Sequence, residues 1–151
     1  DACVARLSVL SYNLLAPLYV RPIDERTGSV QSFAAFEWAE PADEVLAWDK
    51  RGPRLRQELL QAKADVICLQ EVQFQVEQAE SDEGGAEDVH VLPEYLRLDG
   101  YEAVLPSQGN LEQMALRNER VLRCKNAVGN AILYRKDRVK RCDPVVSRGG
   151  G

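Results

Sequence analysis

The clearest hydrophobic pattern in the chain is the run 66–69, Val-Ile-Cys-Leu, which is followed directly by the polar pair Gln70-Glu71. A short apolar run that contains β-branched residues indicates a strand buried on both faces. Ligands of α/β folds gather at the carboxyl ends of strands, and an acid buried there is costly unless a cation meets it. Glu71 is therefore the first candidate for a functional residue. The alternative is a solvated acid just past the end of the strand.

Regular patterns predict four further elements. Residues 7–13 alternate between apolar and polar types, which predicts a strand that ends at Asn13. Pro53, followed by leucines at helical spacing, predicts a helix over 53–63 that leads directly into the strand ending at Glu71. Strands are also expected over 101–105 and 127–135.

The remaining segments have weaker patterns. Residues 20–48 form a long insert without a clear period, anchored by aromatic side chains. Residues 75–88 are rich in acids and predict an exposed, flexible insert, followed by a helix over 88–98. We expect a loop with some helical turns near 111–116 and one more short strand within 138–146. This order of elements predicts an α/β fold, bordering on α+β, with a mixed sheet and flanking helices.

Composition limits the class of protein. The chain has 151 residues, of which 45% are hydrophobic and 28% charged, as in ordinary globular domains. No apolar run approaches the roughly 20 residues of a membrane span, so we expect no membrane partner. The four cysteines lack C-x-x-C spacing and only one histidine, His90, accompanies them, which argues against a zinc site. We expect a reducing, intracellular compartment, cytoplasmic or nuclear.

Charge is distributed unevenly along the chain. Residues 1–110 carry 9 Lys and Arg against 20 Asp and Glu, whereas residues 111–151 carry 10 against 4. A basic segment suits a phosphate-rich partner, and we expect Lys136 and Arg138 to contribute to substrate binding. The alternative is a solvated basic face.

Three segments carry a resemblance to a known family: Ser11-Tyr12-Asn13, Leu69-Gln70-Glu71-Val72 and Gly129-Asn130-Ala131-Ile132-Leu133-Tyr134. Their order and spacing resemble the exonuclease–endonuclease–phosphatase superfamily. Residues 12–16 and 48–72 are most similar to its branch of carbon catabolite repressor deadenylases, nocturnin and the angel proteins. The resemblance implies the amino-terminal half of a DNase-type four-layer α/β sandwich, formed by residues 1–148 and followed by the Gly-rich end 149–151.

The resemblance also implies a chemistry. It makes Glu71 the metal ligand of a Mg²⁺-dependent phosphodiesterase, with Mn²⁺ as an alternative metal, and places Asn13 beside it as a catalytic, phosphate-contacting residue. Mg²⁺ prefers carboxylate oxygen and keeps several waters, so one or two protein carboxylates suffice. The implied activity is that of a poly(A)-directed RNA 3′-exonuclease, with RNA or a nucleotide as substrate and deadenylase complex subunits as partners.

The sequence departs from the family pattern in its second half. The family pattern has an Asp-x-Asn and a catalytic histidine in its second half, whereas here no Asp-x-Asn follows Tyr134 and no histidine follows His90. We therefore expect this chain alone to be inactive and to require the other half of the domain. Two alternatives stay open. One is a truncated, non-catalytic binding module, and the other is a phosphatase or endonuclease of the same fold that acts on another phosphate ester.

Overall fold

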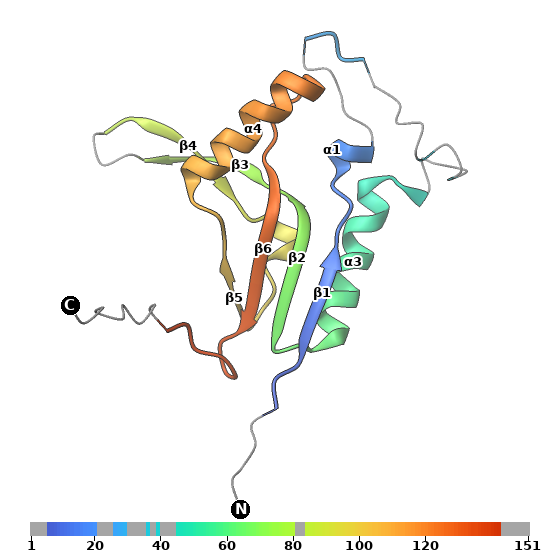
Figure 1. Cartoon of the computed structure of the whole chain (residues 1–151), viewed down its shortest axis with the longest axis vertical. Coiled ribbons are helices and arrows are strands. Elements are labelled where there is room, and N and C mark those ends of the chain that lie inside the picture. The colour runs from blue at the N-terminus through green and yellow to red at the C-terminus, as the bar shows by residue number, and fades with distance from the viewer. Residues whose placement is uncertain are drawn as a thin grey trace, which may run out of the picture.

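A computed structural model describes residues 6–20, 26–29, 36, 39, 45–80 and 84–142. A four-stranded sheet in the order β1-β2-β6-β5 forms its centre, and a two-stranded β3–β4 hairpin projects from it (Figure 1). The strands of the main sheet are β1 (Val9–Asn13), β2 (Val66–Gln73), β5 (Tyr101–Val104) and β6 (Val128–Arg135). β1 runs parallel to β2, whereas β6 is antiparallel to both β2 and β5. The predicted α/β class with a mixed sheet is thus confirmed.

One face of the sheet carries the main core. Alternate residues of β2 and β6 point to this face, and Ile67, Leu69 and Leu133 are at most 1% exposed. Helix α3 (Trp48–Ala62) covers the same face and buries Leu55 and Leu59 in the same cluster. Full burial of one such side chain stabilises a fold by about 1.5–3 kcal/mol, so this face holds the strands in place.

Helix α3 begins five residues before the predicted start at Pro53, which lies inside the helix. Proline lacks the N–H that would continue the helical ladder, so the sequence favoured a start at this residue. Tertiary contacts of the first turn override that signal: Trp48 packs edge-to-face on Tyr95, and Arg51 binds backbone carbonyls of a neighbouring turn.

The predicted helix at 88–98 was wrong, and the segment 75–88 is largely exposed, as predicted, but contains a β-hairpin. Strand β3 (Gln75–Glu80) pairs antiparallel with β4 (Ala86–Val91), and a single 3-10 turn, η2 (Glu94–Leu96), follows. The hairpin ladder satisfies the backbone of an otherwise polar segment, and Pro93 prevents a helix from running through it. His90 is therefore a buried strand residue, with Nε2 3.2 Å from Glu112 Oε2.

Residues 107–126 are more regular than predicted. Helix α4 (Gln108–Leu122) is capped by Ser107, whose Oγ accepts a hydrogen bond from the Asn110 amide at 3.3 Å. Gly109 and Asn110 are poor helix formers, so the sequence did not predict that a helix begins here. The helix buries Leu111 and Ala115 and contacts β6 and β4. Residues 138–142 form no strand, and most of the insert 20–48 and all of 143–151 lie outside the described residues.

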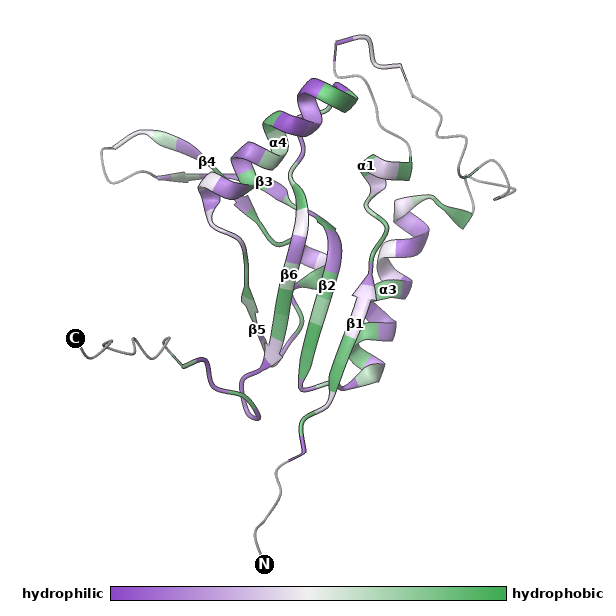
Figure 2. Cartoon of the chain, viewed as in Figure 1, coloured by the Kyte–Doolittle hydropathy of each residue, from purple (hydrophilic) through white to green (hydrophobic). Residues whose placement is uncertain are grey.

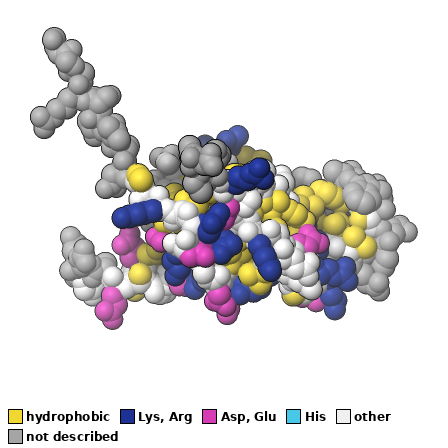
Figure 3. Space-filling model, turned by 90° about the horizontal axis from the view of Figure 1, so that it is seen from below, with side chains coloured by type: hydrophobic (Ala, Val, Ile, Leu, Met, Phe, Trp, Pro, Cys, Tyr) yellow, Lys and Arg dark blue, Asp and Glu magenta, His cyan; other side chains and the backbone are white. Residues whose placement is uncertain are grey.

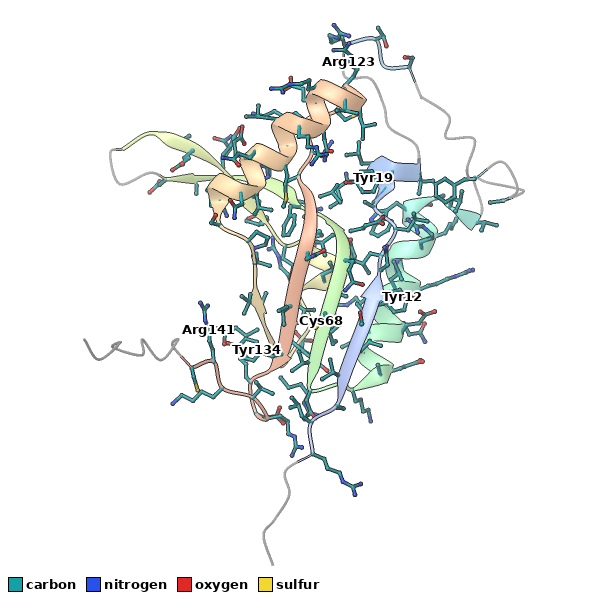
Figure 4. All side chains as sticks on the ribbon, in the orientation of Figure 1. Tyr12, Tyr19, Cys68, Arg123, Tyr134 and Arg141 are labelled. Atoms are coloured by element: carbon teal, nitrogen blue, oxygen red, sulfur yellow. The ribbon has the colours of Figure 1, made fainter. Side chains whose placement is uncertain are left out.

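Among the residues that the structure describes, no element covers the opposite face of the sheet, which we call the open face (Figure 2). Val9 is 61% exposed and Ile132 is 42% exposed, with the half-buried Cys68 opposite Ile132 in the ladder. Figure 2 shows apolar strands on the viewer's side with no described element in front of them, and Figure 4 shows Cys68 on the same sheet. An apolar sheet surface of this kind is a site where another protein layer can pack.

A short helix, α1 (Pro17–Val20), follows β1 and lies at the same end of the sheet as the end of α4 (Figure 1). Within the part of the chain that the structure describes, no helix is both long and apolar enough to cross a membrane.

Candidate functional site

The sheet brings Asn13 and Glu71 together. Asn13 is the last residue of β1 and pairs with Gln70 of the parallel strand β2, so both side chains lie at one end of the sheet. Asn13 Nδ2 donates a hydrogen bond of 2.8 Å to Glu71 Oε1. The predicted proximity of the two residues is confirmed, and their catalytic and metal-binding roles remain predictions.

A β-bulge aims the carboxylate of Glu71. The β2–β6 register shifts between Leu69, opposite Ala131, and Val72, opposite Gly129, so β2 contains one extra residue here. Glu71 itself has φ 55°, in the left-handed region that non-glycine residues rarely adopt. Bulges often lie beside functional sites because they redirect a side chain. The strained backbone therefore turns Glu71 out of the regular strand alternation and towards β1.

The turn after β1 fixes both side chains. The amide of Leu15 donates to Asn13 Oδ1 at 2.8 Å, and the amide of Ala16 donates to Glu71 Oε2 at 3.2 Å. Asn13 therefore accepts from the backbone with its oxygen and presents its amide nitrogen to Glu71. An amide nitrogen carries two hydrogens, and among the described residues only Glu71 accepts from it, so the other N–H of Asn13 can donate to an incoming anion. Leu15 also has a positive φ, of 53°, which shows how tightly the chain turns.

Arg51 of α3 anchors this turn from the other side. Its Nη2 donates to the carbonyl of Leu15 at 2.7 Å and its Nη1 to that of Leu14 at 3.3 Å. Its guanidinium carbon lies 5.0 Å from the centre of the Trp48 ring. The strained turn is thus held by a charged, bidentate donor, which is stronger than a neutral hydrogen bond. The sequence prediction missed Arg51 because it placed the helix start two residues too late to include it.

Tyr19 of α1 interacts electrostatically with Glu71 and with two residues of α4. Burial raises the pKa of Tyr19, the negative charge of Glu71 raises it further, and a side-chain hydrogen bond from Asn118 and the charge of Arg117 act in the opposite direction. The phenol therefore stays protonated and can donate. Figure 4 shows Tyr19 between α1 and the end of α4. Sequence reasoning missed these residues because only the fold brings α4 to this end of the sheet.

The oxygen atoms of this site suit a hard cation. Each oxygen of Glu71 accepts one hydrogen bond and retains a further lone pair for a metal or a water. Mg²⁺ needs few protein ligands because it keeps most of its waters. Among the described residues no group of three or more Asp, Glu, His or Cys side chains could hold a metal ion.

The structure does not bring Lys136 and Arg138 to this pair. β6 is antiparallel to β2, so its carboxyl end meets the beginning of β2, where Arg138 Nε binds Asp65 Oδ1 at 3.1 Å and the Lys136 amide binds the carbonyl of Gly100 at 3.0 Å. Figure 3 views the molecule from this end and shows Lys and Arg interspersed with Asp and Glu. Both residues therefore lie at the opposite end of the sheet from the Asn13–Glu71 pair, and their role in substrate binding stays a prediction.

In comparisons with protein-family models, curated proteins and solved structures, no match to this chain was found.

Proposed function

We propose that this chain forms part of a Mg²⁺-dependent phosphodiesterase, with Glu71 as the metal ligand and Asn13 as a phosphate-binding residue. The observation that carries the proposal is the Asn13–Glu71 contact, at 2.8 Å between two parallel strand ends. Strain at Glu71, the bulge in β2 and the anchored turn all serve to hold this contact. Costly local geometry of this kind clusters at functional sites.

Each side chain has a role that its geometry supports. Glu71 supplies anionic oxygen to the cation, and the remaining N–H of Asn13 donates to a phosphate oxygen without adding negative charge. When bound, the metal polarises the phosphoryl oxygen and neutralises charge that develops in the transition state.

The substrate class that we propose is RNA, attacked from its 3′ end as in a deadenylase. Support comes from the resemblance of residues 12–16 and 48–72 to that branch. A phosphatase or endonuclease of the same fold would use the same Asn13–Glu71 pair, so a panel of oligo(A), duplex DNA and a phosphate monoester distinguishes the three activities.

The open face of the sheet supports the proposal that residues 1–148 form half of a two-sheet domain. Val9 and Ile132 expose apolar surface that a second sheet would bury. In this proposal the second half also supplies the general acid and base, and the chain alone is inactive. The same open face favours a second candidate function, a non-catalytic module that binds a partner through it.

The test is hydrolysis of labelled oligo(A) with Mg²⁺ by a protein that contains this chain together with a second half. We expect 3′ trimming that Glu71→Gln abolishes and Asn13→Ala reduces, whereas Glu102→Gln, on the exposed part of β5, leaves it intact. Full activity of the Glu71→Gln protein would refute the proposal. Trimming by the isolated chain would instead refute only its half-domain part.

A further inference from the structure

A pocket of about 540 Å³ is lined by residues that closely follow Asn13 and Glu71 in the chain, among them Pro17 and Gln73. Rings line much of it: Pro17 of α1, Trp48 of α3, Phe74 after β2, and Pro93 and Tyr95 around η2. Pockets for small ligands combine apolar, aromatic walls with a few polar groups that fix orientation. Its polar lining includes the carboxamides of Gln73 and Asn126.

Two of the ring walls pack on each other, and the Arg51 guanidinium lies over the Trp48 ring, 5.0 Å from its centre. Trp48 and Tyr95 pack edge-to-face, with ring centroids 4.9 Å apart and planes at 69°. Burial raises the pKa of Tyr95, so its phenol stays uncharged. Glu77, an acid of the lining, is paired with Arg97 at 2.6 Å. The pocket therefore favours a flat, uncharged, π-rich group over a free cation.

Two short chain segments connect the pocket to Glu71. Pro17 of the lining directly follows Ala16, whose amide binds Glu71 Oε2. Gln73 lies two residues beyond Glu71 in β2. Its Oε1 accepts from the Leu18 amide at 2.8 Å, so the Gln73 side chain lies against the same segment of chain as that of Glu71. A ligand with its phosphate at Glu71 can thus extend into the pocket.

We propose that the ring-lined pocket binds the nucleobase of the nucleotide whose phosphate lies at the Asn13–Glu71 pair. This inference rests on the proposed phosphodiesterase function and adds to it a base subsite. Aromatic side chains such as Trp48 and Tyr95 offer a surface for stacking that every base can use. Because Gln73 Oε1 is engaged by the backbone, its Nε2 is oriented as a donor to an acceptor on the base edge.

The test uses Trp48 as its own reporter. The chain has two tryptophans, so Trp38→Phe leaves Trp48 as the single tryptophan, which can be excited selectively over the tyrosines. We expect adenosine and AMP to quench its fluorescence with saturation, whereas ribose 5-phosphate, which has a phosphate but no base, does not. Absence of quenching by adenosine, or equal quenching by ribose 5-phosphate, overturns the proposal.

A pair of matched variants locates the site. Removal of a stacking ring weakens binding of a base by about 10-fold or more, so Tyr95→Leu should weaken the adenosine affinity by this factor. Tyr101→Leu removes a half-buried ring at the far end of the sheet and should leave the affinity unchanged. Equal losses in both variants would overturn the proposal, and urea midpoints verify that both variants are folded. If Tyr95→Leu does not fold, the nucleoside titration of the Trp38→Phe chain decides alone.

The same titration separates this inference from the proposed function. Adenosine carries no phosphate, so Glu71→Gln should leave its affinity unchanged. Quenching by adenosine together with undiminished hydrolysis by the Glu71→Gln protein would refute the phosphodiesterase proposal alone. Loss of hydrolysis in that variant without any adenosine binding would refute the base subsite alone.

Discussion

The strain at Glu71 gives an unusual prediction for stability. In most strand positions, replacement of alanine by glycine destabilises a protein, because glycine loses more backbone entropy on folding, by about 0.5–1 kcal/mol. Glu71 has φ 55°, where a Cβ costs about 1–2 kcal/mol and glycine has no such cost. At this position glycine should therefore give a more stable chain than alanine, which is the reverse of the usual order.

Glu71→Ala and Glu71→Gly both lose the carboxylate and its bonds to Asn13 and Ala16. The difference between their free energies of unfolding therefore reports the effect of backbone conformation at position 71. We expect Glu71→Gly to be more stable than Glu71→Ala by about 1 kcal/mol, which is a shift of roughly 0.5 M in the urea midpoint of the purified chain.

The control is Cys68 in the regular part of the same strand, where Cys68→Ala should be more stable than Cys68→Gly. A Glu71→Ala chain that is as stable as Glu71→Gly, or more so, would refute the strained-bulge interpretation. The result is independent of any catalytic assay, so it tests the geometry of the site alone.

Three further predictions concern the surroundings of the site. Arg51→Lys should destabilise the chain by about 2 kcal/mol in urea unfolding, because lysine cannot span the two turn carbonyls. Hydrogen bonds from the backbone and hydroxyl of Ser8, with Arg138 nearby, hold the pKa of Asp65 below its ordinary value of 3.8. This stabilisation is present above that value and is lost as pH falls through the lower pKa of the folded state, so the deficit of Ser8→Ala at pH 7 should shrink below pH 3.8. Lys136→Ala combined with Arg138→Ala should leave the salt dependence of oligo(A) binding unchanged, because both residues lie at the far end of the sheet. A weaker dependence of the oligo(A) affinity on salt in this double variant would show that the two residues contact the substrate.

Much of the sheet could be predicted from local patterns. Alternation over 7–13 and the apolar run that ends at Glu71 are period-two signals that do not depend on tertiary context. Their strand ends also made the Asn13–Glu71 contact predictable, because neighbouring parallel strands bring their carboxyl ends together.

The remaining features depend on contacts between distant residues. The hairpin of β3 and β4 is polar and exposed along most of its length, so its sequence resembles a loop until the two strands pair. Arg51 and Tyr19 join the site only because α3 and α1 pack near the same turn. The distance of Lys136 and Arg138 from the Asn13–Glu71 pair could not be predicted, because charge composition carries no information on strand direction.

The most direct test of the central claim is where a divalent cation binds on the folded chain. Substoichiometric Mn²⁺ added to the isotope-labelled chain should broaden the amide NMR signals of Leu15 and Ala16, which adjoin the Asn13–Glu71 pair. The account predicts this broadening in the unchanged chain and in Glu102→Gln, its reversal by excess Mg²⁺, and its loss in Glu71→Gln. Equal broadening in Glu71→Gln, or broadening confined to the acidic hairpin, would contradict the account.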